Sequence, residues 1–142
     1  MFKIDAVMTT DLVTVSPSDT LDHARFLMRQ HRIRHLPVLD GNDNLVGLLS
    51  QTDVLAATDS FLREKDDRMN TAVLPVEDVM VDDITFVEDQ ASIRQAALCL
   101  ERNRIGCLPV LKDGKLAGIV TDTDFVGICA NLLETMEDTE PA

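Results

Sequence analysis

The stretch His35-Leu-Pro-Val-Leu39, followed by Gly47-Leu-Leu-Ser50-Gln-Thr52-Asp53, occurs a second time in the chain. The second copy reads Cys107-Leu-Pro-Val-Leu111 and Gly118-Ile-Val-Thr121-Asp-Thr123-Asp124. Leu36 and Leu108 are 72 positions apart, whereas Gly47 and Gly118 are 71 apart, so the second copy lacks one residue between these stretches. An internal repeat identifies the supersecondary unit of a fold. Two units of this size, each too small to bury a core alone, are expected to pack on each other.

The repeat extends upstream and covers most of the 142 residues. Val7-Met8 matches Val79-Met80, and Arg32-Ile33 matches Arg104-Ile105. We therefore divide the chain into three parts. Residues 1–70 form a first unit with its lead-in and linker helix, residues 71–136 form a second unit, and residues 137–142 form an acidic tail.

Hydrophobic periodicity predicts the same order of elements in both copies. The first copy has a strand over 12–15, a helix over 21–30 capped by Ser18-Asp19, and strands over 36–39 and 45–49 around a turn at 40–44. A second helix runs from about 50 to 62. The second copy has strands over 84–87, 108–111 and 116–120, a turn at 112–115, and helices over about 93–100 and 123–136. The predicted fold class is α/β, with two βαββα units.

Composition excludes several classes of function. The formal net charge is -12, so the surface repels phosphate backbones, and nucleic-acid binding is not expected. The three cysteines, an odd number without paired spacing, indicate free thiols in a reducing cytosol. The sequence shows no signal peptide and no apolar run long enough to cross a membrane, so we expect a cytoplasmic protein.

The motif Ser/Thr-x-Thr-Asp at each strand-to-helix junction has two interpretations. In the structural one, Ser50 with Asp53 and Thr121 with Asp124 form capping boxes that satisfy free amide groups. In the functional one, the helix N-terminus attracts an anion, while the carboxylate accepts hydrogen bonds from a ribose. Glycines at 47 and 118 would let a ligand approach the backbone.

A second candidate cluster is Arg34, His35 and Pro37. The two basic residues would meet a phosphate if they project toward Ser50, and otherwise they are solvated residues ahead of a strand. Pro37 lacks an amide hydrogen, which leaves room for an edge position or a ligand. The second copy has Gly106 and Cys107 in place of Arg34 and His35 and cannot supply the same charge.

No constellation supports catalysis or metal binding. The chain has no recognisable nucleophile–base pair, Walker-type phosphate loop or zinc spacing, and its three histidines fit no metal motif. We predict no catalytic residue, no metal site and no required cofactor.

The doubled pattern of Val-Met, a β-branched strand, Ile-x-x-Leu-Pro-Val and Gly-x-x-Ser/Thr-x-Thr-Asp resembles a tandem pair of CBS domains, named for cystathionine β-synthase. The resemblance covers about residues 5–68 and 77–136, with no catalytic domain attached. It implies two units packed about a pseudo-twofold axis with two clefts, and a homodimer of such modules. It also implies adenosine ligands in the clefts: AMP, ADP or ATP, with S-adenosylmethionine ranked below them.

Carried over by position, the resemblance implies a set of ligand-binding residues in each copy. Asp53 and Asp124 would hold ribose, with Ser50, Thr52, Thr121 and Thr123 near phosphate. Arg34 and His35 would face the phosphate in the first copy. The base would be lined by Val13, Thr14, Val15, Leu36, Pro37 and Val38 in the first copy, and by Thr85, Phe86, Val87, Leu108, Pro109 and Val110 in the second.

Two departures from the family pattern bear on affinity. Many nucleotide-binding members carry Arg before the Asp, where this chain has Thr52 and Thr123, and the second copy also lacks the Arg-His pair. We therefore expect unequal sites, the one with Asp53 being tighter, and AMP or ADP favoured over ATP.

The sequence thus predicts a non-enzymatic, homodimeric, adenine-nucleotide-binding regulatory module that signals to an unidentified protein by a conformational or dimer change. The alternative is a homodimeric interaction scaffold without a ligand. Nucleic acid and membrane are not expected partners.

Overall fold

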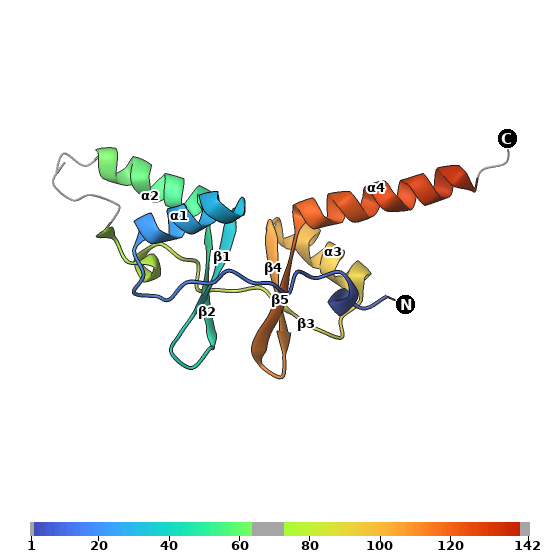
Figure 1. Cartoon of the computed structure of the whole chain (residues 1–142), viewed down its shortest axis with the longest axis horizontal. Coiled ribbons are helices and arrows are strands. Elements are labelled where there is room, and N and C mark those ends of the chain that lie inside the picture. Colours follow the sequence, from blue (N-terminus) through green and yellow to red (C-terminus); the bar gives the residue numbers. More distant parts are fainter. Residues whose placement is uncertain (1, 64–72, 140–142) are drawn as a thin grey trace. The chain divides into compact units, whose positions relative to one another are not determined.

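The computed structural model describes residues 2–63 and 73–139, and its chain forms two compact mixed α/β units (Figure 1). The first-repeat unit contains residues 12–63, 73–85 and 114–116 of the described chain. The second-repeat unit contains residues 2–11, 86–113 and 117–139. The predicted boundary at residues 70/71 lies outside the described residues, and the proposed division of the chain at 136/137 stays a prediction.

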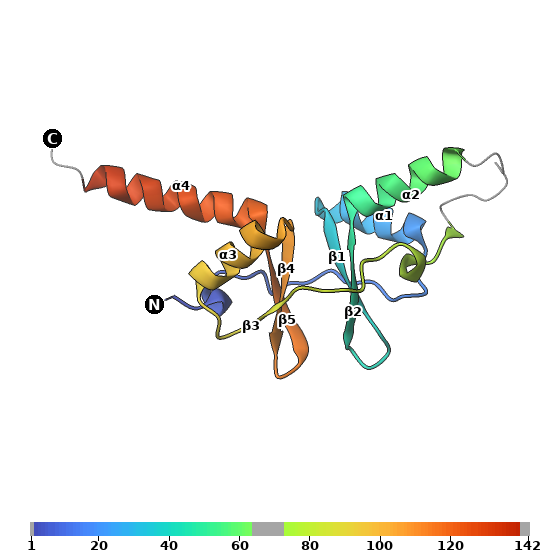
Figure 2. The ribbon, with the colours of Figure 1, turned by 180° about the vertical axis from the view of Figure 1, so that it is seen from behind.

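The first-repeat unit pairs one β-hairpin with two helices. Helix α1 (Leu21–His31) precedes strands β1 (His35–Leu39) and β2 (Leu45–Ser50), and helix α2 (Gln51–Arg63) follows. Figures 1 and 2 show α1 and α2 side by side at the end of the hairpin opposite its turn. A short 3-10 helix, η3 (Val76–Asp78), completes the unit.

The second-repeat unit repeats this order with longer hairpin strands and a longer last helix. It contains η1 (Ile4–Ala6), β3 (Val87–Glu88), α3 (Ile93–Asn103), β4 (Cys107–Lys112), β5 (Lys115–Thr121) and α4 (Asp122–Asp138). The β4–β5 turn has two residues, Asp113 and Gly114, both at positive φ, as a tight hairpin requires. The β1–β2 turn has five residues, 40–44, so the residue absent from the second copy is accounted for by this turn.

The helices follow the predicted pattern, except for the first cap. Ser92 and Gln95 form a capping box on α3. On α1 the capping side chain is Thr20, whose hydroxyl accepts the His23 N–H at 3.2 Å. The prediction that Ser18-Asp19 caps this helix is therefore wrong. Asp19 instead closes the preceding turn, because its Oδ2 accepts the Ser16 N–H at 2.8 Å.

The predicted first strand of each unit is much shorter in the structure, and proline explains why. The Val15 N–H donates to the Pro37 carbonyl, and the Val15 carbonyl accepts the Leu39 N–H. These two bonds form a single parallel bridge between Val15 and Val38. The next bond toward the N-terminus would need an N–H on residue 37, which proline lacks. Pairing therefore does not extend over 12–14. Pro109 holds the same position in β4, and β3 begins only at Val87.

A lead-in is the segment that precedes a repeat in the sequence and contains η1 or η3. The lead-in of each repeat is buried in the hydrophobic core of the other repeat. Ile4 is fully buried with Ala96, Leu108 and Val120 of the second repeat. The equivalent Val76 is fully buried in the core of the first repeat. Backbone hydrogen bonds fix both lead-ins: Thr9 exchanges two with Ile119, and Leu48 exchanges two with Val81.

No helix among the described residues is long and apolar enough to cross a membrane.

Candidate nucleotide sites at the strand-to-helix junctions

In the first-repeat unit, a backbone hydrogen bond joins the end of the β1–β2 hairpin to the N-terminus of α2 at the predicted phosphate site. His35 lies opposite Ser50 in the β1–β2 register, and directly opposed side chains share one face of the sheet. The Arg34 carbonyl accepts the Gln51 N–H at 2.8 Å. The structure therefore brings Arg34, His35 and Ser50 to the same end of the hairpin.

The capping box predicted at this junction is confirmed. Ser50 Oγ accepts the Asp53 N–H at 3.0 Å, and Asp53 Oδ2 accepts the Ser50 N–H at 3.3 Å. Asp53 Oδ1 makes no hydrogen bond to the described part of the chain, and Thr52 is exposed on the first turn. The Asp53 carboxylate thus caps the helix with Oδ2, and its Oδ1 is a second hydrogen-bond acceptor.

The second-repeat unit repeats this geometry. Thr121 Oγ1 accepts the Asp124 N–H at 3.2 Å, and Asp124 Oδ2 accepts the Thr121 N–H at 2.9 Å. The Gly106 carbonyl accepts the Asp122 N–H at 3.1 Å. This bond is equivalent to the one from the Gln51 N–H to the Arg34 carbonyl. Thr123 is exposed on the first turn of α4.

The two junctions differ in charge. Cys107, the counterpart of His35, is 2% exposed, and burial followed by the charges of Asp124 and Asp122 raises the pKa of its thiol to about 12. The second junction has a neutral thiol beside two carboxylates, whereas the first has Arg34 and His35 beside one carboxylate, that of Asp53. The second junction therefore attracts an anion less strongly. Asp122, which belongs at a helix start for structural reasons, also makes this junction more acidic than the first. Aligning it with Gln51 already reveals the extra charge.

The residues predicted to line the base are mostly part of the core. Leu36, Pro37 and Val38 are buried, as are Leu108, Pro109 and Val110. Val13 and Thr14 are half-buried beside the single bridge at Val15, and they make no backbone hydrogen bond to the described residues. Phe86 is exposed and Val87 half-buried, whereas Thr85 groups with the first-repeat unit. A ligand role for this set stays a prediction.

The glycines have a different role from the one predicted. A Cβ on Gly47 would meet the Met80 side chain, and a Cβ on Gly118 would meet Met8 Cγ at 2.8 Å and the Thr9 carbonyl oxygen at 2.9 Å. The space beside each glycine is filled by a lead-in methionine. These glycines admit the lead-in segments rather than a ligand.

The described residues contain no group of three or more His, Cys, Asp or Glu side chains arranged to hold a metal ion.

Known proteins share this architecture. The CBS domain model matches residues 4–60 and 76–131. A solved structure of a putative acetoin utilization protein (AcuB) from Vibrio cholerae is 39% identical, covers 99% of both chains and superposes with a TM-score of 0.82. The structure of CBSX2 in complex with AMP is 31% identical, covers 93% of this chain and 98% of that one, and has a TM-score of 0.78.

Curated relatives differ in length. A CBS domain-containing protein of Dictyostelium discoideum is 34% identical over 92% of this chain and 93% of its own length. By contrast, this chain spans 23% of an inosine-5'-monophosphate dehydrogenase of Methanocaldococcus jannaschii. The matched repeats and the coverage of full-length relatives show that this chain belongs to the CBS domain family, with two tandem copies.

Proposed function

We propose that this chain is a non-enzymatic regulatory module that binds adenine nucleotides at its strand-to-helix junctions. The observation that carries the proposal is the doubled junction itself, in which a hydroxyl and a carboxylate cap a helix beside a hairpin end. The AMP complex of CBSX2, a family member 31% identical to this chain, supports the choice of ligand.

The first-repeat junction offers a nucleotide three complementary groups. The α2 N-terminus carries partial positive charge, which favours a phosphate. Arg34, whose carbonyl accepts the Gln51 N–H, adds a basic residue at the same end of the hairpin. Asp53 Oδ1 is an acceptor for ribose hydroxyls.

The second junction is expected to bind phosphate more weakly. Asp122 and Asp124 both lie at the first turn of α4, beside the neutral Cys107 thiol. Because each additional phosphate charge increases the repulsion, AMP and ADP are favoured over ATP, and the site with Asp53 is the tighter one.

Signalling would occur by population shift within a homodimer. A ligand changes an equilibrium between arrangements only by the free energy with which it prefers one of them. The altered dimer surface would then be recognised by a protein target, and the function would be energy sensing. The three free thiols support a reducing compartment, and we place the protein in the cytoplasm.

A thermal-shift assay on nucleotide-stripped protein tests ligand binding. AMP, ADP, ATP and S-adenosylmethionine are added to wild type, Asp53→Ala and Asp124→Ala. Ligand at about a hundred times its dissociation constant adds roughly 2.7 kcal/mol. At about 2–4 °C per kcal/mol, the expected shift is several degrees.

Removal of a cap lowers the melting temperature by itself, so each shift is measured from the ligand-free value of the same variant. Ser92→Ala is the matched control, because it removes a capping hydroxyl from α3, which has no proposed role in nucleotide binding. We expect Asp53→Ala to abolish most of the AMP shift and Ser92→Ala to keep it. Equal shifts in Asp53→Ala and wild type would reject the assignment.

The second candidate function is a ligand-free interaction scaffold. The observation that favours it is that both Ser/Thr-x-x-Asp motifs already serve as capping boxes, while the predicted base-lining strands are buried. Folded protein that shows no shift with any adenosine ligand would favour the scaffold.

A further inference from the structure

A cavity of about 610 Å³ lies where residues 2–4 meet the first turn of α3, within the second-repeat unit. Figures 1 and 2 show this N-terminal segment beside the helix. Two backbone hydrogen bonds fix the contact, from the Ile93 N–H to the Phe2 carbonyl at 3.0 Å and from the Ile4 N–H to the Ala91 carbonyl at 2.7 Å. Phe2, Ile93 and Leu98 supply apolar lining. A cavity of this size with apolar walls suits a small organic molecule.

Two basic side chains from different segments line this cavity. Of its described lining residues, Lys3 and Arg94 are the charged ones. Neither side chain forms an ion pair or hydrogen bond within the described part of the chain. The formal net charge of the protein is -12, so a cavity with basic groups and no carboxylate in its described lining is a local exception to an acidic surface. An anion is the ligand that such a cavity attracts.

The first repeat shows that the fold itself does not need these charges. At the repeat offset of 72, Lys3 corresponds to Pro75 and Arg94 corresponds to Asp22. The backbone arrangement is the same in both units, because each lead-in forms one antiparallel bridge with the N-cap residue of the adjacent helix. The first-repeat unit thus builds this contact with a proline and an acidic residue in place of the two basic ones.

Arg94 is also unfavourably placed for the stability of the helix alone. The N-terminus of a helix carries partial positive charge, so acidic residues stabilise its first turn and basic ones do not. Helix α1 has Asp22 there, whereas α3 has no acidic residue in its first turn. The cap does not use the guanidinium group, because Ser92 and Gln95 complete the capping box with each other. A bound anion would offset the charge of Arg94.

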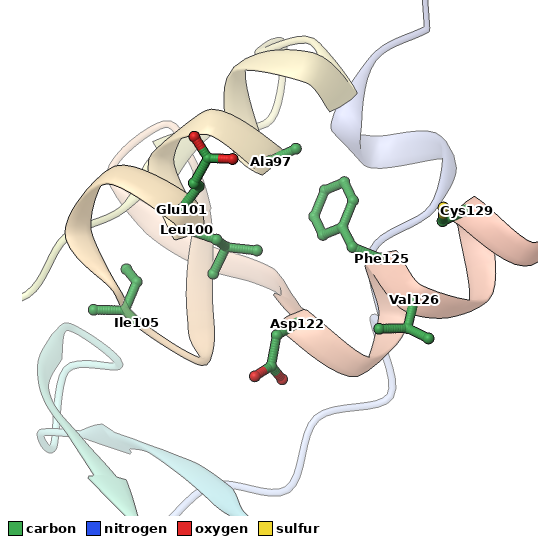
Figure 3. A pocket seen from close by; sticks show the side chains of 8 residues that line it. All are labelled: Ala97, Leu100, Glu101, Ile105, Asp122, Phe125, Val126 and Cys129. Carbon is green, nitrogen blue, oxygen red and sulfur yellow. The ribbon is translucent and has the colours of Figure 1, made fainter.

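The other cavity along α3 has the opposite charge. It is a groove of about 330 Å³ between α3 and α4, shown in Figure 3. Its lining includes the carboxylates of Glu101 and Asp122 beside the apolar Leu100 and Phe125, and no basic side chain among the described residues. This groove repels an anion. Of the two cavities, the one at the start of α3 is therefore suited to an anionic ligand.

We propose that the cavity with Lys3 and Arg94 binds a phosphate monoester that carries an apolar substituent. Such an ester has a charge of about -1.5 to -2 at pH 7, which two cationic side chains match through charge-assisted hydrogen bonds. The walls formed by Phe2, Ile93 and Leu98 receive the apolar substituent. None of the residues proposed for nucleotide binding lines this cavity, so it is a further ligand site that does not rest on the nucleotide proposal.

Titration with phenyl phosphate, followed by amide chemical shifts of the full chain in heteronuclear NMR, tests the site. We expect saturable shifts at residues 2–4 and at the first turn of α3. Phenylacetate has the same ring but a single charge, so its dissociation constant should be about tenfold higher or more. Benzyl alcohol has no charge and should not shift these amides at the same concentrations.

Substitution of the basic residues tests their role. Lys3→Gln with Arg94→Gln should raise the dissociation constant of phenyl phosphate about tenfold or more. Arg102→Gln with Lys112→Gln is the matched control, because it removes the same charge from the same unit away from the cavity, and it should keep the wild-type value. Arg94→Asp should also weaken binding. This variant is expected to fold, because the first repeat has Asp22 at the equivalent position.

Four outcomes would overturn the proposal. Folded protein whose α3 amides show no saturable shift with phenyl phosphate has no such site. Equal affinity in wild type and in Lys3→Gln with Arg94→Gln would show that the charges do not bind the ligand. Comparable binding of benzyl alcohol would show an apolar cavity without preference for an anion. Shifts confined to the residues around Ser50 and Thr121 would reject this cavity and leave the nucleotide proposal intact, which the AMP titration tests separately.

Discussion

Gly47 and Gly118 occupy equivalent places in the two repeats but differ in what surrounds them. A methyl group on Gly47 meets only the flexible Met80 side chain among its nearest atoms. A methyl group on Gly118 also meets the Thr9 carbonyl oxygen, which is held by a hydrogen bond from Ile119. Side chains can move aside, whereas a hydrogen-bonded backbone cannot.

This difference predicts a contrast between two double-mutant cycles. Gly47→Ala and Gly118→Ala should each cost about 1–3 kcal/mol of unfolding free energy through overpacking. In the Met80→Ala background the cost of Gly47→Ala should largely disappear. In the Met8→Ala background most of the cost of Gly118→Ala should remain. Urea unfolding measures all of these values, and equal relief in both cycles would contradict the structure.

Cys107 is predicted to be unreactive despite its place beside a candidate site. Burial first, and then Asp124 and Asp122, raise the pKa of its thiol to about 12 from 9.0. At pH 8 a thiol reagent should label the exposed Cys129 rapidly and Cys107 only after unfolding. Above about pH 9 the unfolded thiol ionises first, so this contribution to stability falls as pH rises toward 12. Comparable labelling rates for Cys107 and Cys129 in folded protein would contradict this assignment.

At the scale of elements, the sequence predicted the helices, the hairpins and the capping boxes, because their signals are local. Ser50 and Asp53, for example, are three residues apart and need no distant partner. The strands predicted at 12–15 and 84–87 are shorter in the structure, pairing only at Val15 and from Val87, because β propensity does not take account of the neighbouring strand. Pro37 and Pro109 remove the one N–H that would have extended the pairing.

The lead-in segments predict a crosswise effect of mutation. Ile4 precedes the first repeat in sequence but is buried in the core of the second, and Val76 is buried in the core of the first. Ile4→Ala should cost about 2–5 kcal/mol and increase amide exchange in α3 and the β4–β5 hairpin. Val76→Ala should instead increase amide exchange in α1 and the β1–β2 hairpin. Faster exchange of α1 and β1 in Ile4→Ala, with α3 unchanged, would disprove the exchanged arrangement.

At the scale of the whole molecule, the duplicated motif was sufficient to predict the family and the order of elements. It could not reveal that the lead-ins are exchanged, because Met8 and Gly118 are far apart in sequence and each is unremarkable alone. The candidate sites were predictable in part. The caps and the extra carboxylate of Asp122 followed from the alignment of the two repeats, whereas the burial of Cys107 depends on how the strands pack.

We propose that one chain carries two adenosine sites of unequal strength. Calorimetric titration of nucleotide-stripped wild-type protein with AMP measures this directly, with Asp53→Ala and Asp124→Ala beside it. We predict one tight site per chain, which Asp53→Ala removes and Asp124→Ala leaves nearly unchanged. Two sites of equal affinity, or a tight site that survives Asp53→Ala, would contradict the account.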